Sequence, residues 1–400
     1  MKACFVFRLF LLSFGVNALS LNANPNSEPA ANASCPLVSL DARTNIWAKY
    51  NLHPNAFRRH QVLAAAAVIS DDLLNKQARK IADVGSFYWL DNTTNMQKVE
   101  EILPEVPCAN IVGLVLQGIQ DRNCTREGFS VPDHERYQRS YGDPLATLIR
   151  AYPRTAFAII IEPGTLPAII NNPNVSSCQA LAKSYRQNVA YALNALKLPN
   201  AITYIDAGHG GSLGRDVLLQ PAAEELAAVY KAAAYPSQLR GIAVNIGGWN
   251  SWDARPGEFE TPYEEPASKR NRAHNEKIFS QLLGRALDKL GVPSNAIVDT
   301  SRNGVIGLRY EWEDWCNVDG AGFGVRPSVV PGLGEQHADA FVWAKAGGVS
   351  DGTSDPSSVT FDPFCGRRDA FSPSPEAGEW NQAYFEMLLR NARPVIAVDT

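Results

Sequence analysis

Acidic and amide side chains stand where several apolar runs of the chain end, and these are the residue types that could do chemistry. They are Asp91, Glu162, Asp206, Asn245 and Asp299. A carboxyl group can donate or accept a proton, and both carboxyl and amide groups hydrogen-bond to hydroxyl groups. If these ends meet in the folded chain, they form a polar site suited to acid–base chemistry or to binding a polyhydroxylated ligand.

Tryptophans gather at the same ends and in the loops that follow them. They are Trp89, Trp249, Trp252, Trp312, Trp315 and Trp343. A sugar ring offers apolar C–H faces and a rim of hydroxyl groups, so it suits flat aromatic faces placed beside carboxylates and amides. Trp89 and Trp343 could instead be core residues, but the clusters in Gly-rich loops favour a carbohydrate-binding site.

The elements that must position these residues are alternating strands and helices. Continuous apolar runs predict strands at 85–91, 111–118, 156–162, 201–206, 242–246, 296–299 and 340–345. Amphipathic stretches predict helices near 62–82, 94–103, 133–151, 176–196, 221–234, 273–290 and 376–391. This alternation is typical of an α/β fold whose parallel sheet is covered by helices. With no linker between the runs, residues 41–400 are expected to form one closed or nearly closed barrel, and the long segments 247–272 and 303–336 to be functional loops.

Composition narrows the classes of partner. The net charge is −4, and the chain therefore lacks the excess of basic residues that a nucleic-acid-binding protein carries. We expect neutral polymers or small uncharged ligands as partners.

Residues 1–20 have the pattern of a signal peptide: basic residues, then an apolar run, then small residues. The apolar run is too short to span a bilayer comfortably. We therefore expect a secreted, extracellular protein that is monomeric and not membrane-bound, with residues 21–40 as a short flexible arm.

The cysteines and sequons fit export. Removal of the leader leaves Cys35, Cys108, Cys124, Cys178, Cys316 and Cys365. An even number in an oxidising compartment suggests disulfides, although six cysteines allow 15 pairings. Glycosylation sequons begin at Asn32, Asn92, Asn123 and Asn174, of which Asn123 is the least favoured because a cysteine occupies its middle position.

Eight ordered segments give the chain a family resemblance. They are SFYWLD (86–91), DRNC (121–124), IEP (161–163), YIDAGH (204–209), DWCN (314–317), GFGVRPS (322–328), AKAGGVSDGTSD (344–355) and AYF (383–385). Together they resemble glycoside hydrolase family 6, the cellobiohydrolases and endoglucanases that hydrolyse β-1,4-glucan with inversion. The resemblance covers the chain from about residue 45 to the end and implies a distorted seven-stranded parallel β/α barrel. It also implies disulfides Cys124–Cys178 and Cys316–Cys365, which leaves Cys35 and Cys108 as the third pair.

The resemblance implies that part of a sugar-binding groove is kept. Asp351 matches the family's proposed base, and Asp206, Trp315 and Lys345 match sugar-contacting positions on the non-reducing side. Trp89, Asp91 and Asn245 are further candidates for substrate binding. On the leaving-group side, two aromatic platforms of the family correspond to Ser212 and Arg215, and the shorter loop after Cys124 suggests an open cleft.

The family's catalytic acid is missing from its motif. An inverting enzyme needs a protonated carboxyl group on the leaving oxygen, and the acid of the family's I-E-P-D motif corresponds here to Gly164. The aspartate that assists it corresponds to Asn123, and a tyrosine near the reacting sugar corresponds to Gln117. Glu162 is a substitute acid in principle, although a structural strand-end role is favoured for it.

Two functions follow from this pattern. The first is a secreted protein of this family type that binds β-1,4-glucan or cello-oligosaccharides with little or no hydrolysis, and that a receptor of another organism could perceive. The second is an active inverting β-1,4-glucanase that uses a displaced acid. No cofactor is expected with either function.

Other chemistries have weaker signals. Gly210–Gly214 matches a G-x-S-x-G nucleophile elbow around Ser212, with Asp299 and His337 following in triad order, but the elbow needs a sharp strand-to-helix turn that the pattern does not predict. The histidines show no metal-ligand spacing, and Gly320–Gly324 lacks the strand and helix that a phosphate-binding loop needs. We expect no metal, and a structural hydrogen-bonding role for His209.

Overall fold

The computed structural model describes most of the chain after the leader and part of the expected arm. The described residues are 34–253, 271–311, 313–331, 337–345 and 347–398. The expected signal peptide (1–20), Asn32 and Trp312 lie outside the described residues. Within the described residues, no helix is both long enough and apolar enough to cross a membrane.

Seven parallel strands carry the fold, as the sequence predicts. They are β2 (Tyr88–Leu90), β3 (Asn110–Leu116), β4 (Ala156–Ile161), β5 (Ala201–Asp206), β6 (Leu239–Val244), β7 (Asn295–Asp299) and β9 (Ala338–Val342). Two short strands were not expected: β1 (Asn51–Leu52) pairs with the start of β3, and β8 (Ser328–Val329) pairs antiparallel with β9.

The strands form a nearly closed barrel. The sheet runs from β3 through β4, β5, β6 and β7 to β9, and β2 pairs with the outer side of β3. The backbone N–H of Phe87, just before β2, donates to the carbonyl of Trp343, just after β9, at 3.0 Å. This contact joins the two ends of the sheet, and the expected distorted seven-stranded β/α barrel is confirmed.

Alternation along the strands divides the core in two. On β4, Ala156, Ala158 and Ile160 belong to the cluster inside the barrel, whereas Phe157 and Ile159 belong to the cluster beneath the helices. Because successive side chains of a strand point to opposite faces, a strand buried on both faces must be continuously apolar. The six residues of β4 are all buried, which explains the uninterrupted apolar run in the sequence.

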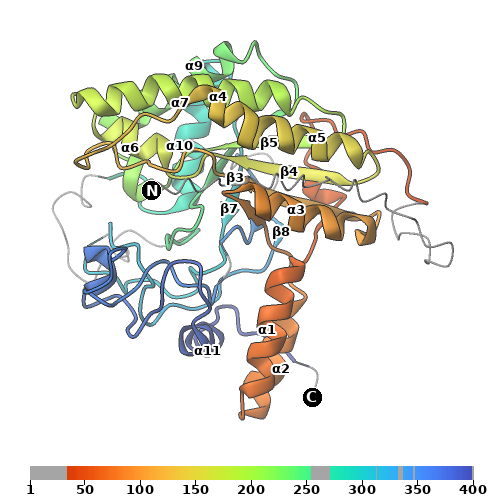
Figure 1. Cartoon of the computed structure of the whole chain (residues 1–400), viewed down its shortest axis with the longest axis vertical. Helices are drawn as coiled ribbons and strands as arrows, with labels where there is room; N and C mark the ends of the chain where they lie inside the picture. Colours follow the sequence, from red (N-terminus) through yellow and green to blue (C-terminus); the bar gives the residue numbers. More distant parts are fainter. Residues whose placement is uncertain (1–33, 254–270, 312, 332–336, 346, 399–400) are drawn as a thin grey trace, which may run out of the picture. The chain divides into compact units, whose positions relative to one another are not determined.

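Helices cover the barrel wall and also build a separate lobe (Figure 1). Those on the wall are α3 (Thr93–Ile102), α4 (His134–Tyr137), α5 (Asp143–Ala151), α6 (Thr165–Asn171), α7 (Ser176–Ala195), α8 (Gly210–Leu213), α9 (Asp216–Ala232) and α10 (Glu276–Lys289). The lobe contains α1 (Ala56–Val68), α2 (Asp72–Ala82) and α11 (Gln382–Arg390), whose buried residues share a cluster with Phe323 and Trp343. Trp343 is therefore a core residue.

The helices differ from the sequence prediction in three main ways. The single helix expected at 62–82 is two helices, because the Asp71 side chain caps α2 by accepting from the Leu74 amide at 2.8 Å. The short helices α6 and α8 were not predicted, since four to seven residues carry too little periodicity. A π-helical turn, Gln138–Gly142, interrupts the helix expected at 133–151.

Part of the expected flexible arm is packed against the barrel domain. Cys35 is 1% exposed and forms a disulfide with Cys108. The backbone amides of Val38 and Leu40 donate to the carbonyls of Pro153 and Pro199 at 2.9 and 2.8 Å. Residues 35–40 therefore belong to the folded domain, because the disulfide and these hydrogen bonds hold them in place.

Candidate active site

The predicted polar residues meet at the carboxyl ends of the strands, which is where parallel barrels assemble their sites. Asp91, Glu162, Asn245 and Lys345 each follow the last residue of a strand by one to three positions, and Asp206 ends β5. Parallel pairing places these ends at one edge of the barrel.

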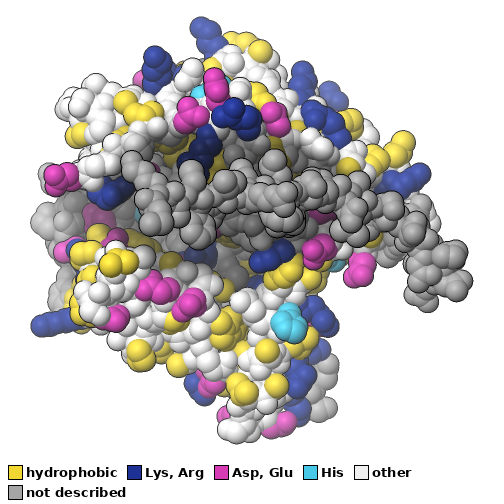
Figure 2. Space-filling model, viewed as in Figure 1, with side chains coloured by type: hydrophobic (Ala, Val, Ile, Leu, Met, Phe, Trp, Pro, Cys, Tyr) yellow, Lys and Arg dark blue, Asp and Glu magenta, His cyan; other side chains and the backbone are white. Residues whose placement is uncertain are grey.

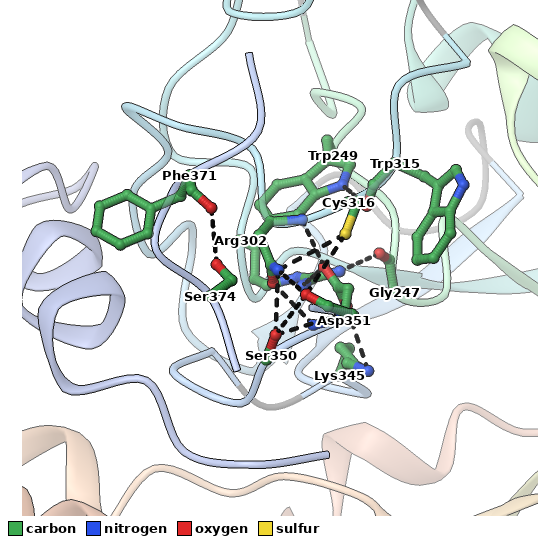
Figure 3. A network of polar contacts seen from close by, with 12 residues as sticks. Gly247, Trp249, Arg302, Trp315, Cys316, Lys345, Ser350, Asp351, Phe371 and Ser374 are labelled. Atoms are coloured by element: carbon green, nitrogen blue, oxygen red, sulfur yellow. Dashed lines mark hydrogen bonds and ion pairs between the residues drawn. The ribbon is translucent and has the colours of Figure 1, made fainter. Parts of the chain in front are cut away.

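A buried ion-pair network surrounds Asp351, the candidate base (Figure 3). Its Oδ2 accepts from Arg302 Nη1 at 2.7 Å and from the Asn317 amide at 3.0 Å, and its Oδ1 lies 3.3 Å from Lys345 Nζ. Burial alone would raise the pKa of Asp351, but the charges of Arg302 and Lys345 outweigh burial and hold that pKa below its ordinary value. Asp351 is therefore ionised at neutral pH and is a weak base.

Aromatic side chains frame this network. The guanidinium of Arg302 stacks 3.9 Å from the centre of the Trp249 ring, and the Trp249 indole N–H donates to the Trp315 carbonyl at 3.0 Å. Trp315 is 40% exposed, and Figure 3 shows its ring directed away from the buried network. The Trp89 indole N–H donates to the Ala344 carbonyl at 2.7 Å, and Lys345 Nζ lies 5.6 Å from its ring centre. The exposed ring of Trp315 is available for stacking on a sugar.

Sequence reasoning did not identify Arg302. It lies three residues beyond Asp299 at the end of β7, and its side chain is 1% exposed. An arginine soon after a strand that ends in a carboxylate is a weak signal, because only the folded chain brings Asp351 to it from the next strand–loop unit.

At Gly164, the position that the resemblance assigns to the family's acid, the chain has no side chain and lies beside a cation. Gly164 is exposed, and its φ of +78° is a left-handed conformation that glycine adopts without strain. Its amide donates to Asp206 Oδ2 at 2.9 Å. A Cβ built there would meet Arg122 Nη1 at 3.2 Å, and Nη1 itself donates to the Pro163 carbonyl at 2.6 Å. A guanidinium therefore borders this position, and the charges of Glu162, Asp206 and Asp121 act on it.

Glu162 points into the protein. It is fully buried, and its two carboxylate oxygens accept from the amides of Gly118 and Ile119 at 2.8 and 3.0 Å. Burial raises the pKa of Glu162 to about 7, against the lowering effect of those two amides. These contacts hold together the loops after β3 and β4, which is the structural role favoured by the sequence.

Asp206 is equally buried beside the acid position. Its Oδ2 accepts from the amides of both Gly164 and Gly208. Burial raises the pKa of Asp206 to about 7, with the Gly164 and Gly208 amides and the charge of Arg122 acting in the opposite direction. The side chain is 1% exposed, so it shapes the site from beneath.

The remaining candidate site residues, Asn123, Gln117 and Asp91, differ in their exposure to solvent. Asn123 is exposed, and its Oδ1 accepts from the Thr125 hydroxyl at 2.8 Å. Gln117 is half-buried at the end of β3. Asp91 is half-buried and accepts from the side-chain amides of Asn92 and Asn95.

Asn245 lies away from any ligand surface. It is 1% exposed, and its side-chain amide donates to the carbonyls of Asn250 and Asp299 at 3.0 and 2.9 Å. Its polar atoms thus organise the loop after β6, and the expected substrate contact has no support from this arrangement.

The leaving-group side holds no aromatic at either corresponding position. Ser212 is 6% exposed within α8, where its hydroxyl donates to the His209 carbonyl at 2.9 Å. Arg215 lies at the N-cap of α9 and is half-buried. Neither of these side chains offers an aromatic face for stacking on a sugar.

The structure contradicts the nucleophile-elbow alternative. The Ser212 hydroxyl is used within its own turn, and Asp299 accepts from the amides of Gly247 and Lys345. His337 instead contacts Ser294 and Asp288. No hydrogen bond joins these three residues in the described part of the chain, because each lies in a separate local network.

A buried network supports the loop after β5. His209 Nδ1 lies 2.9 Å from the side-chain nitrogen of Asn250, which also donates to Glu276 at 2.8 Å. Burial lowers the pKa of His209 to about 3, so its imidazole is neutral. This is the structural role expected for His209.

Among the described residues, no group of three or more His, Cys, Asp or Glu side chains is placed to hold a metal ion.

The disulfides follow the implied pattern. Cys35–Cys108, Cys124–Cys178 and Cys316–Cys365 are all formed. The last two tie segments beside Asn123 and Trp315. The sequon residues Asn92 and Asn174 are both exposed, and their glycosylation stays a prediction.

Comparisons with known proteins identify relatives that match most of the chain. The family model "Glycosyl hydrolases family 6" matches residues 47–392. The 1,4-beta-D-glucan cellobiohydrolase CEL6C of Podospora anserina is 50% identical over 375 residues, which cover 92% of each chain. Exoglucanase-6A of Humicola insolens is 35% identical, over 89% of this chain and 78% of that protein.

Solved structures agree with the sequence relatives. Cellobiohydrolase II (Cel6A) of Humicola insolens, in complex with glucose and cellotetraose, superimposes with a TM-score of 0.80 at 34% identity, covering 88% of this chain and 100% of that one. The CcCel6A catalytic domain complexed with p-nitrophenyl beta-D-cellotrioside gives a TM-score of 0.81 at 35% identity, covering 89% and 99%. The chain therefore belongs to glycosyl hydrolase family 6.

Proposed function

We propose that this chain is a secreted family 6 protein that binds β-1,4-linked cello-oligosaccharides and hydrolyses them little or not at all. The observation that carries the proposal is Gly164. The position that the resemblance assigns to the catalytic acid has no side chain and borders the guanidinium of Arg122. General-acid catalysis typically contributes a rate factor of about 10² to 10⁴, so its loss leaves at most slow turnover.

The displaced-acid alternative has no comparable support from Glu162. To protonate a leaving oxygen, Glu162 would have to release the two amides of Gly118 and Ile119 and turn out of full burial. Leaving those buried amides unpaired would cost about 1–3 kcal/mol each.

Ligand binding is supported by what remains at the other end of the groove. Trp315 offers an exposed ring, and its backbone carbonyl is linked through Trp249 and Arg302 to the pre-formed network of Asp351 and Lys345. Relatives with solved complexes hold cellotetraose and an aryl cellotrioside. Three disulfides fit folding in an oxidising compartment, which supports secretion.

The test is a calorimetric titration with cellobiose through cellohexaose. We expect affinity to rise with length while the chain fills the side that contains Trp315. It should then level off, because Ser212 and Arg215 offer no stacking on the leaving-group side. Absence of binding to every length would overturn the proposal, and so would a further rise with each added glucose.

A further inference from the structure

Arg122 is a cation beside the vacated acid position. Its Nη1 donates to the Pro163 carbonyl, and no carboxylate oxygen of the described residues lies within ion-pair distance of its guanidinium. Three carboxylates act on its charge without bonding to it: Asp121 pairs with Arg126, and Glu162 and Asp206 each accept from two backbone amides. Arg122 therefore has guanidinium N–H groups that can donate hydrogen bonds to a ligand.

The surface at Gly164 and Arg122 is open to solvent. Gly164 is exposed and Arg122 is only half-buried, so solvent reaches both residues. The three atoms nearest to a Cβ built on Gly164 all belong to Arg122, at 3.2, 3.8 and 3.9 Å. A small acidic group entering from the groove would thus meet a guanidinium first.

The position of the aromatic residues sets which end of an oligosaccharide would arrive there. If the proposed function holds, Trp315 and Lys345 hold the non-reducing part of the ligand, and the leaving-group side lacks platforms at Ser212 and Arg215. A chain bound in this way ends at Gly164 with its reducing-end glucose. The C1 substituent of that glucose then faces Arg122.

We propose that the groove selects cello-oligosaccharides whose reducing end is an aldonic acid, with the C1 carboxylate held by Arg122 in the space beside Gly164. This inference rests on the proposed function and specifies its ligand. A guanidinium matches the planar geometry of a carboxylate, and a charge-assisted hydrogen bond is about twice as strong as a neutral one. A neutral hemiacetal at C1 gains no such contact.

The experiment compares two ligands of equal length by calorimetry, cellotriose and cellotrionic acid. We expect the acid to bind about tenfold more tightly, in line with a hydrogen bond between charged partners. Arg122→Gln should reduce this ratio to about one and leave the affinity for cellotriose within about twofold, whereas Arg122→Lys should keep part of the preference. Arg59→Gln removes an equal charge from α1, where Arg59 pairs with Asp83, and should leave the ratio unchanged.

Gly164→Asp supplies a second, independent variant. Its carboxylate would fill the site and neutralise Arg122, so it should abolish the preference for the acid. A ratio of one in the unmodified protein, or a preference that survives Arg122→Gln, overturns the inference even if cellotriose binds. Failure of both ligands to bind overturns the proposed function as well.

Two further ligands test the position of the carboxylate. A cellotriose that carries its carboxylate at C6 of the non-reducing glucose should bind no more tightly than cellotriose itself. If it bound as tightly as cellotrionic acid, the assignment of the carboxylate to the reducing end would be contradicted. Gluconate alone should compete only weakly. Competition by gluconate or acetate as effective as that of cellotrionic acid would show an adventitious ion only.

Discussion

At the residue scale, the chemistry of this site depends on where its carboxylates point. Asp351 is ionised between Arg302 and Lys345, while Glu162 and Asp206 are buried and accept backbone amides. Each of these carboxyl groups therefore has a partner within the protein. If the proposed function holds, none of the three is placed to donate a proton to a leaving oxygen.

Restoring the acid should need two substitutions. In Gly164→Asp alone, the new carboxyl group lies beside Arg122, which lowers its pKa and keeps it ionised and unable to donate a proton. Adding Asn123→Asp gives Arg122 a second negative neighbour and raises the pKa of the carboxyl group introduced at position 164. We expect kcat on p-nitrophenyl cellotrioside to change little in the single variant and to rise by about 10² or more in the double variant. Equal rates in the two variants would contradict this role for Arg122.

The pH dependence of stability should show the buried carboxyl at Asp206. Its pKa is about 7 in the folded chain and near 4 when unfolded, so the folded state binds the extra proton between these values. Asp206 should therefore lower the free energy of unfolding by up to about 4 kcal/mol as pH rises from about 4 to about 7, while the neutral His209 acts in the opposite direction. Asp206→Asn keeps an oxygen acceptor for both amides and removes the titration.

Denaturant unfolding at several pH values measures this effect. The variant should lose less stability than the parent across the same pH range. Glu162, whose pKa is also raised by burial, acts in the same direction as Asp206 in both proteins. An unchanged decline in Asp206→Asn would show that Asp206 is not the group that titrates.

At the element scale, the loops after β7 and β9 act together to support Trp315. The Phe364 ring lies 6.4 Å from the Trp315 ring at 44°, and the Arg367 guanidinium covers Phe364 at 4.2 Å. Arg367 is in turn paired with Glu311 and Asp314, the second of which is adjacent to Trp315. The exposed ring is thus supported by a second ring and a charge cluster.

Removing the supporting ring should weaken binding through Trp315. Phe364→Ala should lower the affinity for cellotetraose by about two- to tenfold, the range of an aromatic contact. In a Trp315→Ala background the same change should cost no further affinity. Phe57→Ala, on the exposed face of α1, is the matched control and should have no effect on binding. Additive losses in the double variant would show that Phe364 acts independently of Trp315.

Removing two of the disulfides one at a time should distinguish effects on stability from effects on ligand binding. Replacing Cys316 and Cys365 by serine opens a loop of 49 residues and should destabilise the fold by up to about 4 kcal/mol. It should also weaken cellotetraose binding, because it separates the segments of Trp315 and Phe364. Replacing Cys35 and Cys108 should lower the melting temperature but leave affinity unchanged, because that bridge ties residues 35–40 to the segment before β3. Loss of affinity in both variants would indicate general loosening instead.

At the whole-molecule scale, the alternation of apolar runs with amphipathic stretches predicted the barrel but not the detail of its site. All seven parallel strands were expected, since strands buried on both faces leave continuous apolar runs such as β4. Short elements such as α6 and α8 left no periodic signal. Arg302 was missed because its ion pair with Asp351 joins loops that are distant in sequence. Asn245 was expected to bind substrate because its residue type suits a sugar, yet only the fold reveals that it is buried.

At the same scale, the face shown in Figure 2 has Lys and Arg side chains interspersed with Asp and Glu side chains, in keeping with the net charge of −4. No broad basic patch that would attract a polyanion is visible on that face.

The most direct test follows the fate of bound cellotetraose. The protein is incubated with cellotetraose at a concentration that saturates it, and products are quantified by chromatography beside an active family 6 cellobiohydrolase. We expect calorimetry to show saturable binding while cellobiose release is slower than that of the active enzyme by about 10² or more. Release of cellobiose at a rate comparable to the active enzyme would contradict the account, since it would require a proton donor that Gly164 does not supply.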